Sequence, residues 1–215
     1  MSDRGVLITF EGIDGCGKST QLRLAKDWLC SNGVSCLATH EPGATPLGRE
    51  IRQLLLASGR HVTAEAELLL FLADRAQHVR EQLAPALVHN RVVLCDRYSD
   101  STHAYQMAAR KLGQDERMLA LLAFAECGVH PDLTLWFDVS VDVAWHRMQQ
   151  RQKNGGEHSR FDLEARSFHQ RVAEGFAQLA RQYPDRIRRI DASQGIEHVH
   201  CQVRMEIESF LEARG

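Results

Sequence analysis

The feature that most constrains this chain is a glycine-rich segment at residues 12–19, with the sequence Gly-Ile-Asp-Gly-Cys-Gly-Lys-Ser. It matches the pattern G-x-x-x-x-G-K-[ST], follows the apolar, β-branched run 6–10, and opens an amphipathic run that reaches Leu29. A strand, a glycine loop and a helix in this order are the context in which the pattern wraps phosphate groups. Glycines let backbone N–H groups turn inward, and the helix N-terminus adds partial positive charge. The segment therefore predicts a nucleotide triphosphate site rather than a glycine-rich surface turn.

Individual residues of this segment have distinct expected roles. Lys18 can reach the β- and γ-phosphates, and the Ser19 hydroxyl can bind Mg²⁺. Asp14 is unusual because a carboxylate repels bound phosphates unless a cation or a hydroxyl donor intervenes, so we expect it to face an acceptor substrate or a water on Mg²⁺. The predicted ATP-binding residues of the loop are Gly12, Ile13, Asp14, Gly15, Cys16, Gly17, Lys18, Ser19 and Thr20.

Apolar runs and helical spacing alternate along the rest of the chain. After the first strand and helix, the sequence predicts strands at 34–39, 92–95, 133–138 and 187–190. It predicts helices at 47–57, 64–88, 101–110, 115–127, 141–150, 161–181 and 196–211, with a kink near Pro85 and a mobile polar loop at 152–159. Strands that alternate with helices favour a parallel, three-layer α/β sheet. Because the sequence shows no repeat or linker, we expect a single domain over residues 1–215.

Charge and cysteine content limit the possible partners. The 215 residues carry a formal net charge of −2, so no overall field favours nucleic acid or an acidic membrane. The expected partner is a small phosphorylated molecule. The six cysteines form no C-x-x-C pair and show no zinc spacing, which predicts free thiols. With no signal peptide and no run long enough to span a membrane, we expect a cytoplasmic protein.

An acidic and a basic residue follow the third predicted strand. Asp96 ends this buried run, where its carboxylate would face the phosphate loop and could hold Mg²⁺. Arg97 comes next, and a guanidinium binds phosphate oxygens with two parallel hydrogen bonds. The alternatives are a turn or cap role for Asp96 and a structural ion pair for Arg97.

Several further motifs join the phosphate loop in a specific combination. They are Phe-Glu-Gly-Ile-Asp-Gly-Cys-Gly-Lys-Ser at 10–19, Glu41-Pro42-Gly43 with Thr45, Phe71-Leu72-Ala73-Asp74-Arg75, Asp96-Arg97-Tyr98, Ser101-Thr102, Ala104-Tyr105-Gln106, Pro131-Asp132-Leu133-Thr134 and Ile190-Asp191-Ala192. On these motifs the chain resembles bacterial thymidylate kinases over nearly its whole length. The resemblance implies a phosphate-loop kinase fold with a five-stranded parallel sheet and a short lid near 147–162. It also implies transfer of a phosphoryl group from MgATP to dTMP, and a homodimer packed through helices such as the one that starts at Ala64.

The resemblance also implies the contacts of dTMP. Phe71 would stack on thymine, Arg75 would donate to a thymine carbonyl oxygen, and Arg97 would hold the phosphate. Tyr105 would crowd the sugar 2′ position, and Asp14 would accept from the 3′-hydroxyl. The polar edge of the base would meet Ser101, Thr102 and Gln106. Without the resemblance, core packing would be the simpler interpretation of Phe71.

The lid segment is basic, with Arg147, Arg151, Lys153 and Arg160. Charge pattern alone would make it a solvated basic face. Some relatives carry a basic residue at the position of Gly15, and those that lack one are thought to supply a lid arginine instead. The resemblance therefore makes Arg151 and Arg160 candidate catalytic residues beside Lys18 and Arg97, with Arg147 over adenine.

Two positions depart from many relatives, which have Arg and Gly where this chain has His40 and Ala44. A neutral imidazole does not replace a permanent charge, so the sequence does not support a phosphate contact at position 40. Two other functions stay open. One is a kinase for another nucleoside monophosphate or a deoxynucleoside. The other is a nucleotide-dependent switch, although the chain has no Asn-Lys-x-Asp segment of the kind that reads guanine in GTP switches.

Overall fold

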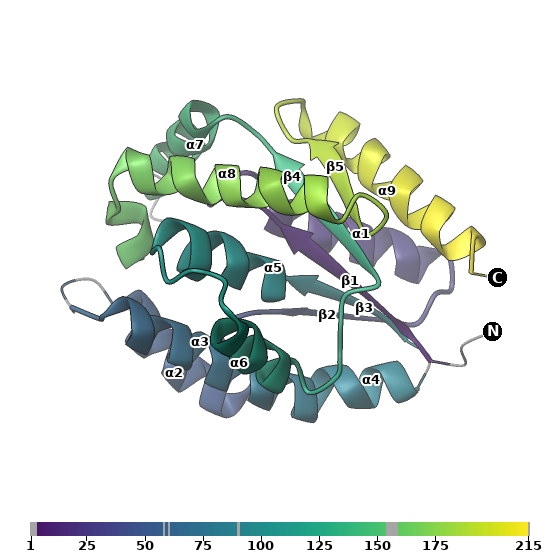
Figure 1. Ribbon diagram of the computed structural model, residues 1–215. Coiled ribbons are helices and arrows are strands. Elements are labelled where there is room, and N and C mark those ends of the chain that lie inside the picture. The colour runs from purple at the N-terminus through teal and green to yellow at the C-terminus, as the bar shows by residue number, and fades with distance from the viewer. Residues whose placement is uncertain (1–3, 58, 60, 90, 154–158, 215) are drawn as a thin grey trace.

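A five-stranded, wholly parallel sheet forms the centre of the protein in the computed structural model, which describes residues 4–57, 59, 61–89, 91–153 and 159–214. The strand order is β2-β3-β1-β4-β5. The strands are β1 (Val6–Glu11), β2 (Cys36–His40), β3 (Val92–Asp96), β4 (Leu133–Asp138) and β5 (Ile187–Asp191). Helices lie on both sides of this sheet (Figure 1). The predicted three-layer α/β fold is confirmed.

The central strands are apolar because both of their faces are covered. All six residues of β1 are buried, as are the first four of β3, so these strands show near-continuous apolar runs rather than alternation. The pairing places Phe10 opposite both Asp96 and Leu135. β3 and β4 follow one another in the chain but lie on opposite sides of β1. Such a reversal opens a crevice at the carboxyl ends of the strands, where ligands bind.

The helices largely occupy the predicted regions. They are α1 (Lys18–Ser31), α2 (Pro46–Leu56), α3 (Ala64–His78), α4 (Ala84–Val88), α5 (Ser99–Thr102), α6 (Glu116–Glu126), α7 (Val141–Lys153), α8 (Arg166–Gln182) and α9 (Ile196–Glu212). The second strand starts at Cys36 rather than at residue 34. Val34 instead donates its N–H to the Leu29 carbonyl, as part of the turn that ends α1.

Two predicted helices are interrupted. The predicted helix 64–88 contains a π-helical turn, Val79–Leu83, between α3 and α4. Pro85 lacks an N–H and its ring crowds the carbonyl four residues earlier, which explains why the turn before it widens. Similarly, the predicted helix 101–110 begins at Ser99 as α5 and continues as a π-helical turn, His103–Ala109.

The region around the predicted lid also differs from its prediction. α7 continues through Lys153, so residues 152 and 153 are helical and not part of a loop. The predicted helix 161–181 begins instead as a short 3₁₀ turn, Arg160–Leu163, and α8 starts at Arg166. Ser159 and Asp162 form a capping box at this turn, and Glu164 and Ala165 are extended, which separates it from α8. The rest of the predicted loop, 154–158, lies outside the described residues.

All six cysteines are free, as predicted. Within the described part of the chain, none of the helices combines the length and the apolar character needed to cross a bilayer.

Candidate functional site

A cavity of about 1110 Å³ opens at the carboxyl ends of the parallel strands. The phosphate loop forms one end of it, and side chains from α3, β3 and the segments that follow β3 form the other. Most of the predicted site residues line it: Asp14, Gly15, Cys16, Gly17, Lys18, Ser19, Thr20, Phe71, Arg75, Asp96, Arg97, Ser101, Thr102, Tyr105, Gln106, Arg147 and Arg151. Gly12, Ile13 and Arg160 do not. One continuous cavity therefore gathers residues predicted for two different ligands.

The phosphate loop has the backbone geometry that the glycines predict. Gly15 and Gly17 have φ angles of 82° and 95°, in the left-handed region that favours glycine. Gly17 immediately precedes α1, and within the described residues no side chain caps the N-terminus of this helix and none in its first turn is acidic. The first N–H groups of α1 are therefore open to an anion.

α7 packs directly on this loop. A Cβ built at Gly15 would overlap the carbonyl oxygen of Ala144 and lie 2.9 Å from Met148 Cγ. Gly12 contributes its carbonyl to Arg97, and Ile13 is buried in the core. There is no room for a side chain at Gly15, and its absence lets α7 pack against the phosphate site.

Two oxygen groups suited to Mg²⁺ meet beside the loop. The Ser19 hydroxyl, in the first turn of α1, donates to Asp96 Oδ2 at the end of β3. The described residues contain no group of three or more His, Cys, Asp or Glu side chains that could hold a metal on their own. Mg²⁺ in nucleotide sites takes one or two protein oxygens and completes its shell with phosphate and water. The residues present fit that mode of binding.

Asp14, Arg97 and Tyr105 form a hydrogen-bonded triangle in the cavity wall. Arg97 Nη2 donates to Asp14 Oδ1 at 2.7 Å and to the Tyr105 hydroxyl oxygen at 3.0 Å, and this hydroxyl donates to Asp14 Oδ2 at 2.9 Å. Lys18 Nζ lies 3.9 Å from Asp14. Burial raises the pKa of the Asp14 carboxyl, but Arg97 and Lys18 outweigh it and hold this pKa well below its usual range. Asp14 is thus a fixed negative charge, and Arg97 is paired with it rather than with Asp96.

A second carboxyl group, that of Glu11, is linked to Arg97 through the Ser101 hydroxyl. Ser101 accepts from Arg97 Nη1 at 3.0 Å and donates to Glu11 Oε2 at 2.5 Å. The Tyr98 N–H donates to Glu11 at 2.6 Å. Burial and the nearby Asp100 carboxylate raise the pKa of Glu11 to about 8. Glu11 was not predicted from the sequence; the available signal was an acidic residue that closes a fully buried apolar run.

Arg75 is fixed by the strand-end loop that follows β2. Its Nε donates to Glu41 Oε2 at 2.9 Å, its Nη1 donates to Thr102 Oγ1 at 2.8 Å, and its guanidinium lies 4.9 Å from the Tyr98 ring centre. Glu41 also contacts His78 Nδ1 at 2.9 Å. Arg75 lines the cavity although it is almost fully buried, so this network aims one edge of the guanidinium at the site.

The two positions that depart from many relatives lie beside this loop. The His40 imidazole lines the cavity, and burial together with Arg52 lowers its pKa, which favours the neutral form. The Ala44 carbonyl accepts from Gln82 Nε2 at 2.9 Å.

Phe71 lies at the cavity surface within an aromatic cluster. Its ring centre is 6.1 Å from that of Phe161, which in turn is 6.0 Å from that of Tyr105. Phe71 is only partly buried, so it can present a face to a ligand while it packs on the core. Gln106, predicted to meet the base, lines the cavity, and its Nε2 donates to Glu67 at 2.7 Å.

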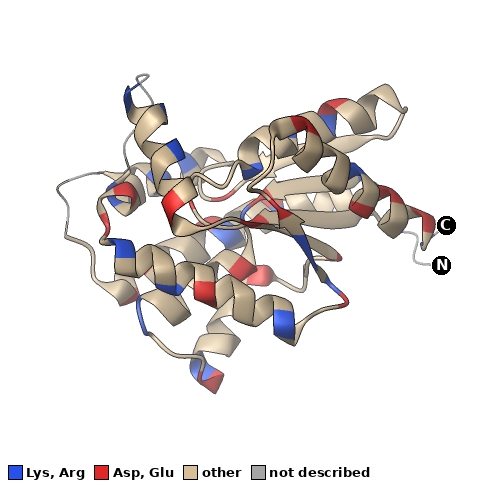
Figure 2. Ribbon diagram, turned by 90° about the horizontal axis from the view of Figure 1, so that it is seen from above, with Lys and Arg blue, Asp and Glu red and all other residues tan. Residues whose placement is uncertain are grey.

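The basic residues of the lid region have different surroundings. Arg147 Nη1 donates to the Ala192 carbonyl at 2.9 Å and to the Cys16 carbonyl at 3.5 Å, which ties α7 to the phosphate loop. Arg151 is half exposed, with Nη2 3.7 Å from Asp162 Oδ2. Arg160 is largely buried and donates to Glu67 and to the Leu55 carbonyl. Figure 2 shows Lys and Arg segments mixed with Asp and Glu segments along the helices, consistent with the small net charge.

Comparisons with known proteins in sequence and in structure point to one family. A family model described as thymidylate kinase matches residues 10–203. The chain is 45% identical over 214 residues to a thymidylate kinase of Desulfovibrio desulfuricans, covering 98% of each chain. It is 45% identical over 205 residues to one from Nostoc punctiforme, covering 94% of this chain and 95% of that one. A crystal structure of thymidylate kinase from Ehrlichia chaffeensis superposes with a TM-score of 0.72 at 30% identity, covering 95% of this chain and 98% of that one. A match of this extent, in sequence and in fold, shows that the chain belongs to the thymidylate kinase family.

Proposed function

We propose that this protein transfers the γ-phosphoryl group of ATP to dTMP, giving dTDP and ADP. The observation that carries the proposal is the single cavity that has a phosphate loop at one end and the Asp14–Arg97–Tyr105 triangle beside Phe71 and Arg75 at the other. Two phosphorylated molecules bound in this way would meet with their phosphates between Lys18 and Arg97. Family membership supports both substrates.

The donor nucleotide binds through the phosphate loop. The free N–H groups of the loop and of the first turn of α1 contact its phosphates, and Lys18 neutralises charge on the β- and γ-phosphates. Ser19 and Asp96 would hold Mg²⁺, which would offset the negative charge of the same phosphates. Arg147 lies beside Ala192 at the edge of the cavity and borders the adenine.

The acceptor nucleotide binds at the opposite end. Phe71 stacks on thymine, and such stacking contributes about 1–3 kcal/mol per base. Arg75 donates to a base carbonyl oxygen, Arg97 holds the phosphate, and Asp14 accepts from the 3′-hydroxyl. The Tyr105 ring crowds the 2′ position and so selects a deoxyribose.

Phosphoryl transfer needs charge stabilisation and exclusion of water more than proton transfer. A phosphate oxygen of dTMP attacks the γ-phosphorus, and the bond from this phosphorus to the bridging oxygen of ADP breaks. The acceptor is already anionic near neutral pH, so no general base is required. Lys18 and Arg97 stabilise the spread charge, and closure of a lid near 147–162 adds an arginine and excludes water. Arg151 is the better candidate for this arginine because it lines the cavity, whereas Arg160 must leave Glu67 to reach the phosphates.

We further propose that the chain is a single domain, that it forms a homodimer and that it works in the cytoplasm. Two large apolar side chains support the dimer, because Leu69 of α3 and Phe124 of α6 are 55% and 81% exposed and their helices pack against each other. Size-exclusion chromatography with light scattering tests the dimer. A monomer mass at micromolar protein concentration would refute it.

A coupled assay of ADP release across nucleoside monophosphates tests the substrate. We expect dTMP to give the highest kcat/KM, and ADP release to require an acceptor. Higher turnover with CMP, AMP or GMP would favour another monophosphate kinase, and turnover with thymidine would favour a deoxynucleoside kinase. ADP release without any acceptor would favour a switch. Calorimetry with dTMP provides a second readout that does not depend on turnover.

A further inference from the structure

Glu67 is a fully buried carboxylate outside the cavity that joins three segments. It lies on α3 with none of its surface exposed. It accepts from Gln106 Nε2 at 2.7 Å, from Arg110 Nη2 at 3.0 Å and from Arg160 Nη2 at 2.6 Å. A buried carboxylate is tolerated only when its oxygens are paired in this way. Glu67 does not line the nucleotide cavity, yet it pairs with two arginines, Arg110 and Arg160.

The ion pair with Arg160 holds the 3₁₀ turn Arg160–Leu163, at the end of the predicted lid region. Arg160 Nε donates to the carbonyl of Leu55, at the end of α2, at 2.7 Å, so this guanidinium bridges α2 and α3. Its centre also lies 4.5 Å from the ring of Phe161, the next residue. Phe161 is 5% exposed and packs between Phe71 and Tyr105. Glu67 is therefore linked through Arg160 to the aromatic wall of the acceptor end.

Arg110 holds the same turn from the other side. Its Nη2 lies 2.6 Å from Glu164 Oε1, just after the turn, and its guanidinium lies 5.7 Å from the Phe161 ring. The positive charges of Arg110 and Arg160 are thus balanced by the negative charges of Glu67 and Glu164 around Phe161. Removing one buried charge leaves the others without full compensation.

We propose that Glu67 is a positioning residue for the acceptor nucleotide, which fixes Phe161 through Arg160 and Arg110 and so sets the aromatic wall against which the base binds. The proposal rests on the proposed function, because it takes the aromatic end of the cavity as the dTMP end. In this role Arg160 acts on Glu67 and Phe161 rather than on the transferring phosphoryl group. Among the described residues, Asp14 of the phosphate loop reaches this network only indirectly, by accepting from the Tyr105 hydroxyl beside Phe161, so the ATP end should respond less than the dTMP end.

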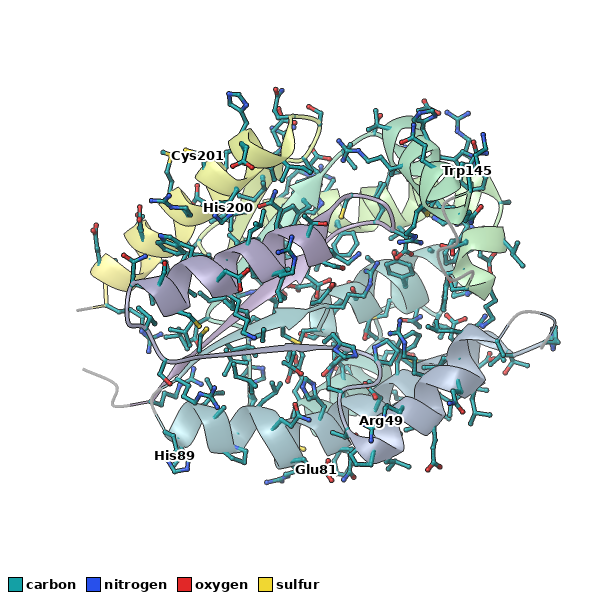
Figure 3. The ribbon with its side chains drawn as sticks, turned by 180° about the vertical axis from the view of Figure 1, so that it is seen from behind. Arg49, Glu81, His89, Trp145, His200 and Cys201 are labelled. Atoms are coloured by element: carbon teal, nitrogen blue, oxygen red, sulfur yellow. The ribbon has the colours of Figure 1, made fainter. Side chains whose placement is uncertain are left out.

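Glu67→Gln tests the proposal because glutamine keeps the shape and removes the charge. We expect the KM and the calorimetric Kd for dTMP to rise about tenfold, while the KM for ATP and kcat change less than about twofold. The matched control is Glu81→Gln, since Glu81 is exposed, bonds to Gln77 and lies at the outer edge of the molecule (Figure 3). An equal rise in both KM values in a folded Glu67→Gln protein would overturn the proposal, as would an unchanged KM for dTMP; circular dichroism checks that the variant is folded.

Two further variants keep the proposal testable if Glu67→Gln does not fold. Arg110→Gln removes the second support of Phe161 and should raise the KM for dTMP in the same selective way; no rise would count against the proposal. Combining Glu67→Gln with Arg160→Gln gives a double-mutant cycle. If the two residues act through one contact, the double variant should raise the KM for dTMP less than the product of the single effects. Effects that multiply, or a fall in kcat for Arg160→Gln with an unchanged KM for dTMP, would place Arg160 on the phosphates and refute the proposal.

The wild-type protein in the same assays separates the role of Glu67 from the proposed function. Selective dTMP turnover by the wild type with no effect of Glu67→Gln would refute only the role of Glu67. Absence of dTMP binding by the wild type would refute the proposed function and this inference with it.

Discussion

The two ends of the cavity are built in different ways. The donor end is built mainly on one continuous segment, residues 14–20, whose backbone N–H groups and first helical turn provide most of the binding groups. The acceptor end draws side chains from α3, from the end of β3, from the π-helical turn His103–Ala109 and from the turn Arg160–Leu163. At the donor end the main chain sets the geometry. At the acceptor end the geometry is set by ion pairs between residues that are far apart in sequence. Removing either charge of a pair leaves the other charge buried without a partner.

Lys18→Ala should have the largest effect, because it removes a charge from the donor end without changing the backbone. Lys18 is 6% exposed, and its ammonium group lies 3.9 Å from Asp14. We expect kcat to fall at least about 10³-fold, in line with the loss of one well-placed group that stabilises transition-state charge. ADP release measures this, and circular dichroism should show an intact fold. An active Lys18→Ala protein would contradict the role of the phosphate loop.

Gly15→Ala tests whether the donor end depends on its backbone. Gly15 has a φ of 82°, and a Cβ there would overlap the Ala144 carbonyl. Left-handed strain and overpacking together should lower the free energy of unfolding by about 2–4 kcal/mol and raise the KM for ATP at least about tenfold as α7 is displaced. Thermal melting and steady-state kinetics measure the two effects.

The control for this variant is Gly33→Ala. Gly33 has a similar φ of 76° but no atom within 4 Å of its built Cβ, so it carries the strain without the contact. Equal losses in the two variants would mean that α7 does not press on the loop. A larger loss at Gly15 would also explain why this chain cannot carry the basic residue that some relatives have at that position.

The contrast between local and long-range determinants also explains how much of the fold could be predicted from the sequence. β1 and β3 were predicted because strands buried on both faces are apolar throughout. An interruption near Pro85 was predicted because proline has no N–H to donate, but its form, the π-helical turn Val79–Leu83, was not predicted. The extended residues after Leu163 were missed because a capping box within a helix-like stretch is a weak local signal.

The candidate site divides in the same way. The phosphate loop was predicted because its chemistry is local to one motif. Glu11 and Glu67 were not predicted, since their burial depends on partners such as Ser101 and Arg160, which lie 90 and 93 residues away in sequence. A single sequence gives the acidic residue but not the distant arginine or hydroxyl that makes its burial possible. Arg160 itself was named a candidate catalytic residue from the family resemblance, and its ion pair with Glu67 depends on the same long-range packing.

Tyr105 tests the acceptor end with two substitutions. Tyr105→Ala should lower the preference for dTMP over the corresponding ribonucleotide about tenfold, because the ring no longer crowds the 2′ position. Tyr105→Phe keeps the ring and should keep the preference, but it should lower kcat/KM for both substrates because Asp14 and Arg97 lose the hydroxyl between them. Competition between the two nucleotides in one assay measures the ratio. An unchanged ratio in Tyr105→Ala would remove the steric role.

Glu11→Gln should have the smallest effect, and the effect should be seen in how the free energy of unfolding depends on pH. The pKa of Glu11 is raised from 4.5 to about 8, so folding takes up a proton in this range and the free energy of unfolding falls as the pH rises through it. Glutamine cannot titrate, so the variant should lose this part of the slope and melt about 2–4 °C higher than the wild type near pH 8. Thermal melting between about pH 5 and pH 8 measures it, with Glu81→Gln as the surface control. Because Glu11 reaches Arg97 only through Ser101, kcat should change little. If the melting temperature changed with pH in the same way in the wild type and in Glu11→Gln, Glu11 would not take up this proton on folding. A charged Glu11 carboxylate would then be linked to Arg97 through Ser101.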